Sequence, residues 1–270
     1  MTNKKADQIN LELNRLQQKW YDDLSQCYKD YNNFSSPFCF GVCQRTIDEN
    51  AKGKPLLMFA GEEARDWCFD KNQQADLDYL QGYAISYFER QFCDNFNFEQ
   101  NKFAQDYPQS FKNKNTSKFW SFLKTIKQQN NLALCWNNLD KLHRIKNNKT
   151  LPLSCSQEDD LHNIPCKNGK SLLLSEINLL QPDVVVFVKY VNSIAKALGI
   201  DKNQLLQIKT DCQKQNLYVA DISDLCRQHN LFDKKDTVAL FLLNHPNCRK
   251  KDFLSQATKQ TTQAINRAIK

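Results

Sequence analysis

Residues 171–188, SLLLSEINLLQPDVVVFV, join two segments of different character on either side of a proline. Apolar residues at helical spacing predict a helix over 171–181, which Pro182 ends because proline cannot continue a helix. The run DVVVFV at 183–188 is rich in β-branched residues and predicts a strand. A strand that is apolar at every position is covered on both faces, as in the parallel sheets of α/β proteins.

The same alternation of apolar runs and amphipathic segments continues along the chain. Further strands are predicted at 56–60, 132–136, 217–220 and 237–246. Because helices separate these buried strands, we expect a three-layer α/β/α fold with a central, mainly parallel sheet of four to five strands.

The amino-terminal part of the chain differs from this pattern. Apolar residues at helical spacing predict an amphipathic helix over 5–32, and turn-forming residues predict a loop-rich passage over 33–54. A second polar, irregular passage is expected over 146–170, longer than an ordinary connection. We therefore divide the chain into an N-terminal helical extension, 1–50, and an α/β/α domain, 51–270.

The charge balance favours an anionic partner. The chain has 37 lysines and arginines against 30 acidic residues, a formal net charge of +7. Basic residues cluster at 112–118, 141–149 and 248–253. Such clusters suit phosphate groups, so we expect DNA or another nucleic acid as the partner.

The cysteines and the hydropathy pattern indicate in which cellular compartment the protein is expected. Eleven cysteines occur without any C-x-x-C pair, which argues against a zinc ribbon and favours reduced, mostly buried thiols. No apolar run approaches the roughly 20 residues that cross a bilayer, and the amino terminus is too polar for a secretory signal. We expect a cytoplasmic protein with no membrane partner, no metal and no cofactor.

Polar side chains follow each predicted strand. The sets are Gly61, Glu62, Glu63, Arg65 and Trp67; Asn137, Asn138, Asp140, Lys141 and His143; Lys189, Tyr190 and Asn192; and Asn244, His245, Pro246 and Asn247. Parallel sheets bind ligands beyond the carboxyl ends of their strands, so we expect the functional site there. Neither a G-x-G-x-x-G motif nor a P-loop is present, which argues against a dinucleotide or nucleoside-triphosphate site.

Four motifs in this order resemble the uracil-DNA glycosylase superfamily. They are GEEARDW (61–67), NNLDK (137–141), the helix–proline–strand unit of 171–188, and NHPN (244–247). The resemblance covers 55–255 and is greatest to microbial branches with G-E-x-P-G or G-Q-E-T-N-G-W type motifs. It implies a uracil-DNA glycosylase-like fold and hydrolysis of the N-glycosidic bond of uracil, or of another deaminated or damaged base, after the base leaves the stack.

The resemblance also implies catalytic roles. Glu62 or Glu63 would position a water molecule and stabilise the oxocarbenium-like sugar. Glu63 is favoured because the G-Q-E-T-N-G-W type motif also matches Trp67. His245 would stabilise the negative charge that develops on the departing base.

Binding roles follow in the same way. Asn138 would hydrogen-bond the edge of the flipped base, and Trp67 or Phe69 would stack on its face. The backbone around Gly61 and Asn247 would hold flanking phosphates. The predicted side-chain contacts to phosphate are Lys141, Arg249 and Lys250.

Two features keep other functions open. Ala64-Arg65 stands where the superfamily has proline or a small residue, and Lys189-Tyr190 stands where its third strand usually ends in glycine. The alternative to a monomeric glycosylase is a catalytically inactive member that binds nucleic acid or a protein partner through the same cleft. A third possibility is an unrelated α/β hydrolase or transferase acting on a small nucleotide.

Overall fold

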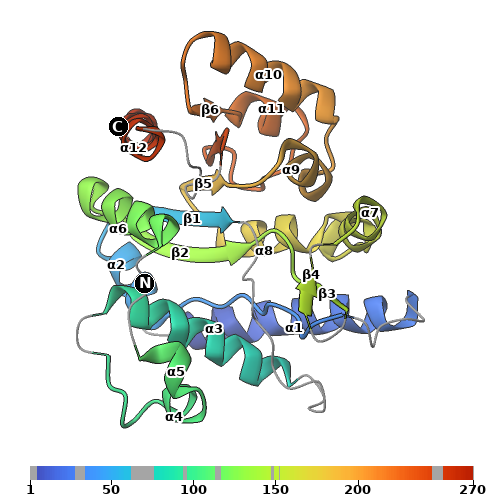
Figure 1. Ribbon diagram of the computed structural model, residues 1–270, viewed down its shortest axis with the longest axis vertical. Coiled ribbons are helices and arrows are strands. Elements are labelled where there is room, and N and C mark those ends of the chain that lie inside the picture. Colours follow the sequence, from blue (N-terminus) through green and yellow to red (C-terminus); the bar gives the residue numbers. More distant parts are fainter. Residues whose placement is uncertain are drawn as a thin grey trace.

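A computed structural model describes residues 5–27, 34–61, 76–93, 96–112, 117–146, 149–151, 153–244 and 252–269. Its centre is a sheet with helices on both faces (Figure 1). The sheet strands are β1 (Leu56–Gly61), β2 (Ala133–Asn138), β5 (Val184–Phe187), β6 (Val219–Asp221) and β7 (Val238–Leu242).

The strands lie in the order β2-β1-β5-β7-β6. The first four are parallel, and β6 pairs antiparallel with β7. Every residue of β1, β2 and β5 is buried. The prediction of an α/β protein with a mainly parallel sheet is therefore confirmed.

The helices connect and cover the strands. Their bounds are α1 (Lys5–Cys27), α2 (Gln44–Ala51), α3 (Leu77–Phe92), α4 (Lys102–Asp106), α5 (Pro108–Phe111), α6 (Lys118–Asn130), α7 (Cys155–Asn163), α8 (Leu172–Leu180), α9 (Val191–Leu198), α10 (Lys202–Lys214), α11 (Ser223–Gln228) and α12 (Phe253–Ala268). The connection from β1 to β2 contains α6 and runs toward the β2 edge of the sheet. The connection from β2 to β5 contains α8 and runs in the opposite direction, past β1. Because both crossovers are expected to be right-handed, these opposite directions place α6 and α8 on opposite faces. In agreement, α6 contacts α12, and α8 contacts α9 (Figure 1).

The segment 171–188 folds as its sequence predicts. Ser171 caps α8 by accepting a hydrogen bond from the Leu174 N–H at 3.3 Å. Gln181 ends the helix in the left-handed conformation, with φ 50°, and Pro182 leads into β5.

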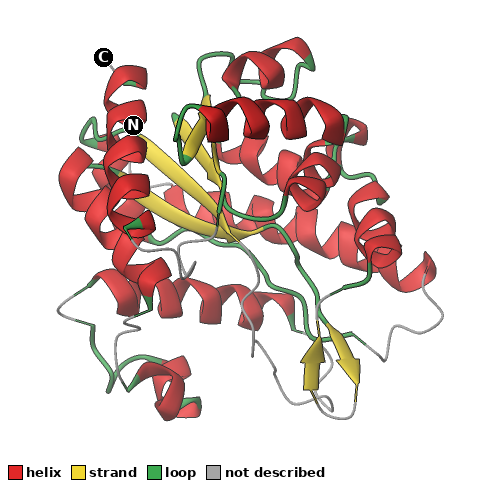
Figure 2. Ribbon diagram, turned by 45° about the horizontal axis from the view of Figure 1, so that its top comes forward, coloured by secondary structure: helices red, strands yellow, loops and turns green. Residues whose placement is uncertain are grey.

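The two predicted loop passages contain regular structure. Helix α2 lies within 33–54. The passage 146–170 contains α7 and a short 3-10 helix, Lys167–Gly169. It also supplies β4 (Lys149–Leu151), which pairs antiparallel with β3 (Arg144–Lys146) in a small separate sheet (Figure 2).

Helix α1 packs against α8, α2 and α3. Its Leu13 and the following Phe40 belong to the same hydrophobic core as the central strands. The division of the chain at residue 50 stays a prediction.

Two further expectations concern thiols and membranes. The cysteines whose side chains are described carry free thiols, and Cys39, Cys43, Cys135 and Cys226 among them are buried. In the described part of the chain, no helix is both long and apolar enough to cross a membrane.

Candidate functional site

The carboxyl edge of the sheet brings together the ends of β1, β2 and β5. Gly61 at the end of β1 is in register with Asn138 at the end of β2. On the other side of β1, Ala60 is in register with Phe187, which places Val188 level with Gly61. Gly61 and Asn138, predicted to share a site, are therefore neighbours on adjacent strands.

Asn138 is fully buried, with 0% exposure. Within the described residues, neither its Nδ2 nor its Oδ1 has a hydrogen-bond partner. A buried amide without partners costs on the order of 1–3 kcal/mol, so native proteins seldom keep one. Among the described residues, the carboxamide thus has both a donor and an acceptor left unused at the strand end.

Aromatic rings lie on the same face of the sheet as Asn138. Alternate strand residues share a face, so Trp136 lies beside Asn138, and Asn137 points to the opposite face. A Cβ atom added to Gly61 would lie 3.2 Å from the Phe119 ring and 3.7 Å from Trp136 Nε1. Gly61 therefore permits close approach of these aromatic rings to the strand end.

On the opposite face, Asn137 belongs to a buried polar cluster. Glu176 Oε2 accepts from Asn137 Nδ2 at 2.9 Å and pairs with Lys141 Nζ at 2.7 Å. Lys141 also donates to Asn137 Oδ1 at 2.5 Å. That same oxygen accepts from the Asn138 N–H at 2.8 Å, which fixes the backbone of Asn138.

The cluster extends to the amino-terminal helix. Gln17 of α1 donates through Nε2 to Glu176 Oε1 at 2.7 Å and to the Phe40 carbonyl at 3.0 Å. Burial lowers the pKa of Lys141, and the adjacent Glu176 carboxylate opposes this effect. The ion pair with Glu176 therefore favours the charged form of Lys141 inside the protein.

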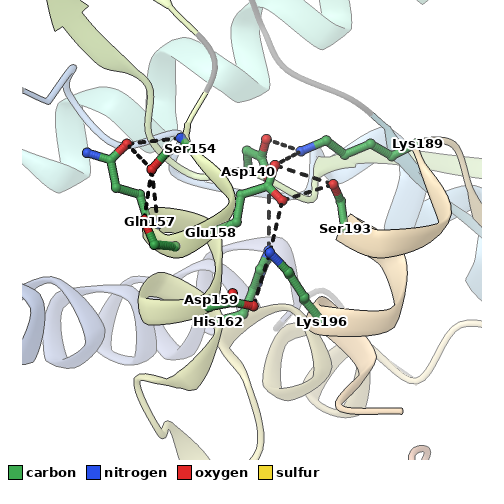
Figure 3. A network of polar contacts seen from close by, with 10 residues as sticks. Asp140, Ser154, Gln157, Glu158, Asp159, His162, Lys189, Ser193 and Lys196 are labelled. Atoms are coloured by element: carbon green, nitrogen blue, oxygen red, sulfur yellow. Dashed lines mark hydrogen bonds and ion pairs between the residues drawn. The ribbon is translucent and has the colours of Figure 1, made fainter. Parts of the chain in front are cut away.

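A second buried cluster lies after β5 (Figure 3). Lys189 donates to Asp140 and, at 3.1 Å, to Glu158 of α7. Glu158 also accepts from Ser193 of α9 at 3.2 Å. Burial by itself would lower the pKa of Lys189, but the two carboxylates outweigh it and the pKa is raised.

His162 of α7 lies next to this second cluster, with Nε2 3.9 Å from Asp140 Oδ1. Burial lowers its pKa to about 4, so the imidazole is neutral at pH 7 and forms no ion pair. A cavity of about 10 Å³ beside His162 and Asp140 is near the size of one water molecule. In the described ranges, no group of three His, Cys, Asp or Glu side chains is placed to hold a metal ion.

No protein-family model, curated protein or solved structure matches this chain. The site is therefore interpreted from its own residues.

Several predicted site residues lie outside the described residues. They are Glu62, Glu63, Trp67, Phe69, His245, Asn247, Arg249 and Lys250. Their predicted roles stay predictions.

The position of Lys141 does not fit its predicted role as a phosphate contact. Its side chain is only 4% exposed, and its ammonium group is engaged by Glu176 and Asn137. A contact with phosphate would leave the Glu176 carboxylate buried without its counter-charge. We therefore give Lys141 an internal role instead of the predicted phosphate contact.

Sequence reasoning did not find Glu176, Phe119 or Trp136 as parts of this site. Glu176 had a signal, because it is the one carboxylate inside the apolar run 172–180. A charged residue at such a position is rarely fully buried without a partner. The aromatic residues had no comparable signal, since Phe119 is one of three aromatic residues in α6 and Trp136 lies within the apolar run of β2.

Proposed function

We propose that the protein is a uracil-DNA glycosylase-like enzyme that hydrolyses the bond between deoxyribose and a deaminated base. The observation that carries the proposal is the buried carboxamide of Asn138 at the carboxyl edge of the sheet, which has no hydrogen-bond partner among the described residues. An energetic cost of this kind is expected where a ligand supplies the missing hydrogen bonds.

The chemistry of a flipped base suits this position. The edge of uracil presents an N–H donor beside carbonyl acceptors, and hypoxanthine and xanthine present similar edges. One carboxamide can accept from the N–H and donate to the neighbouring carbonyl. The Phe119 and Trp136 rings near Gly61 offer apolar walls for a planar ring.

The sequence adds the groups needed for hydrolysis. Glu62 and Glu63 follow Gly61 directly, and His245 follows Asn244 close after the end of β7. In the proposed reaction a glutamate, Glu63 by preference, positions a water molecule for attack on the sugar C1′. The water oxygen bonds to C1′ as the C1′–N bond breaks, the electron pair of that bond leaves with the base and is stabilised by His245, and one proton of the water passes to the glutamate carboxylate.

The partner follows from the reaction and from the charge. A net charge of +7 favours a polyanion. The hydrolysis itself consumes only water. DNA is therefore the proposed substrate, and no cofactor is part of the proposed reaction.

The test is a base-release assay on labelled oligonucleotides that carry one uracil, hypoxanthine or xanthine, in single- and double-stranded form. Alkali after incubation cleaves the strand wherever a base has been released. Wild type is compared with Glu62→Gln, Glu63→Gln and His245→Ala. We expect cleavage by wild type and its loss in one of the two glutamate variants.

The outcomes separate the proposal from its alternatives. DNA binding by wild type without base release on any substrate would favour the inactive, nucleic-acid-binding member. Affinity for free nucleosides but not for DNA would favour an enzyme of small nucleotides.

A further inference from the structure

Tyr190 is 73% exposed, the highest exposure among the large hydrophobic side chains that the structure describes. It directly follows Lys189 at the carboxyl end of β5 and precedes the first residue of α9. A single exposed aromatic residue on a surface is ordinary by itself. Two features distinguish Tyr190: the backbone on both sides of it is held in place, and it lies close to Asn138 along the edge of the sheet.

The backbone before and after Tyr190 is firmly held. Lys189 is anchored by Asp140 and Glu158, from two other parts of the chain (Figure 3). The Tyr190 carbonyl accepts from the Ile194 N–H of α9 at 3.1 Å. The ring is thus presented from a rigid point, and ordering it on a ligand costs little conformational entropy.

The register of the sheet relates Tyr190 to Asn138. Asn138 pairs with Gly61, and Val188 is level with Gly61 on the other side of β1. Neighbouring strands are about 4.8 Å apart, so the backbones at Asn138 and Val188 are separated by roughly 10 Å. Tyr190 lies two residues after Val188 and therefore at most about 7 Å from it. This offset suits contact with a nucleotide next to the one whose base reaches Asn138.

We propose that Tyr190 is a stacking residue for the nucleotide that adjoins the flipped one in a single-stranded or locally opened DNA substrate. This inference rests on the proposed function, because it takes DNA as the ligand of the carboxyl edge. Stacking on an exposed aromatic ring tolerates any base, since every base has a π-face. Tyr190 therefore strengthens binding without selecting the sequence around the target.

The test measures binding, which does not depend on base release. A fluorescent single-stranded oligonucleotide with one uracil is titrated with wild type, Tyr190→Ala, Tyr190→Phe and Phe98→Ala. Phe98 is a matched control, because it is 40% exposed and precedes α4, which lies far from α9 in Figure 1. We expect about 10-fold weaker binding by Tyr190→Ala and affinities near wild type for Tyr190→Phe and Phe98→Ala.

A second oligonucleotide locates the contact. It carries abasic residues in place of the nucleotides on both sides of the uracil. Wild type should lose affinity for it, while Tyr190→Ala should bind both oligonucleotides equally, because the stacking partner is already absent. Equal affinity of wild type and Tyr190→Ala for the first oligonucleotide overturns the inference, as does an equal loss for both proteins on the second.

The binding test and the base-release assay together separate failure of this inference from failure of the proposed function. Base release by wild type, together with a DNA affinity of Tyr190→Ala equal to that of wild type, would contradict the role of Tyr190 and leave the proposed function intact. DNA binding that depends on Tyr190, without base release by wild type, would support the stacking contact and contradict the proposed glycosylase activity. Absence of DNA binding by wild type overturns both.

Discussion

Asn137 and Asn138 are adjacent and fully buried, yet their side chains have opposite surroundings. Asn137 is hydrogen-bonded through both of its side-chain polar atoms, to Glu176 and Lys141. Neither polar atom of the Asn138 side chain has a partner in the described part of the chain. The first residue contributes to stability, and we infer that the second is kept for binding.

Leucine substitutions separate these roles, because leucine has a branched outline similar to that of asparagine. Asn137→Leu should lower the free energy of unfolding by about 3 kcal/mol or more, since it leaves Glu176 and Lys141 short of partners. The Asn138→Leu variant should be at least ~2 kcal/mol more stable than the Asn137→Leu variant, because it removes an amide that makes no side-chain hydrogen bond to the described residues. Urea unfolding measures both values, and equal destabilisation would contradict the contrast.

The buried ion pair gives a second prediction for single residues. Glu176→Leu should lower the free energy of unfolding by about 3–5 kcal/mol, because it leaves the Lys141 charge buried without a counter-charge. Lys141→Met combined with Glu176→Leu should recover part of that loss. The four proteins of this double-mutant cycle are compared by urea unfolding. A double variant as unstable as the sum of the two single variants would show that the pair does not act as a unit.

Among the elements, α1 reaches the site through Gln17, which bonds Glu176 and the Phe40 carbonyl. Gln17→Ala should therefore destabilise the protein by about 1–3 kcal/mol, because it removes a buried hydrogen bond to the Glu176 carboxylate, whereas the Phe40 carbonyl keeps its bond from Gln81. Gln18→Ala is the control, since Gln18 bonds Asp22 at the exposed face of the same helix. Thermal unfolding of the two variants compares them directly. Similar midpoints would show that α1 is not tied to the site in solution.

Helix α7 makes stability depend on pH through His162. Its folded pKa is about 4, below the ordinary value of 6.5, chiefly because of burial. Asp140 and Asp159 oppose this shift, while Lys189 and Lys196 add to it. Between these pH values the unfolded chain binds a proton that the folded protein does not, so stability falls as pH falls from about 6.5 to 4.

The contribution of His162 over that range is on the order of 3 kcal/mol. His162→Gln should have a flatter dependence of the unfolding free energy on pH than wild type across the same window. Urea unfolding at several pH values gives both curves. Parallel curves would mean that His162 titrates normally in the folded protein.

Elements that depend on continuous apolar runs were predictable from sequence. The strand predicted at 183–188 is found at Val184–Phe187, and the helix predicted at 171–181 is found at Leu172–Leu180. Helix α2 was missed because its sequence, QRTIDENA, has little apolar periodicity, and Thr46 and Ile47 are its buried residues. Strand β6 has three residues, and its antiparallel direction depends on tertiary pairing that local sequence does not encode.

The candidate site was predictable only where it follows strand ends. Gly61 and Asn138 were expected together because parallel strands end at the same edge. The pairing of Lys141 with Glu176 joins residues 35 positions apart in the sequence and requires the packing of α8 on the sheet. Such contacts follow from the three-dimensional arrangement and have no local signature.

At the scale of the whole molecule, the excess of basic residues should control DNA binding. Affinity for a single-stranded oligonucleotide should fall steeply and linearly in a plot of log affinity against log salt concentration. Fluorescence anisotropy at several salt concentrations measures the slope. A slope near zero would contradict electrostatic recognition of a nucleic acid.

The most direct test of the proposed function joins the site to the reaction. Single-turnover release of uracil is measured for wild type and Asn138→Leu under conditions in which both are folded. We predict release by wild type and a rate at least about 100-fold lower for the variant, because a base site loses several kcal/mol without its hydrogen bonds. Release at the same rate by both proteins, or no release by wild type, would contradict the assignment of Asn138 as the base-binding residue of a glycosylase.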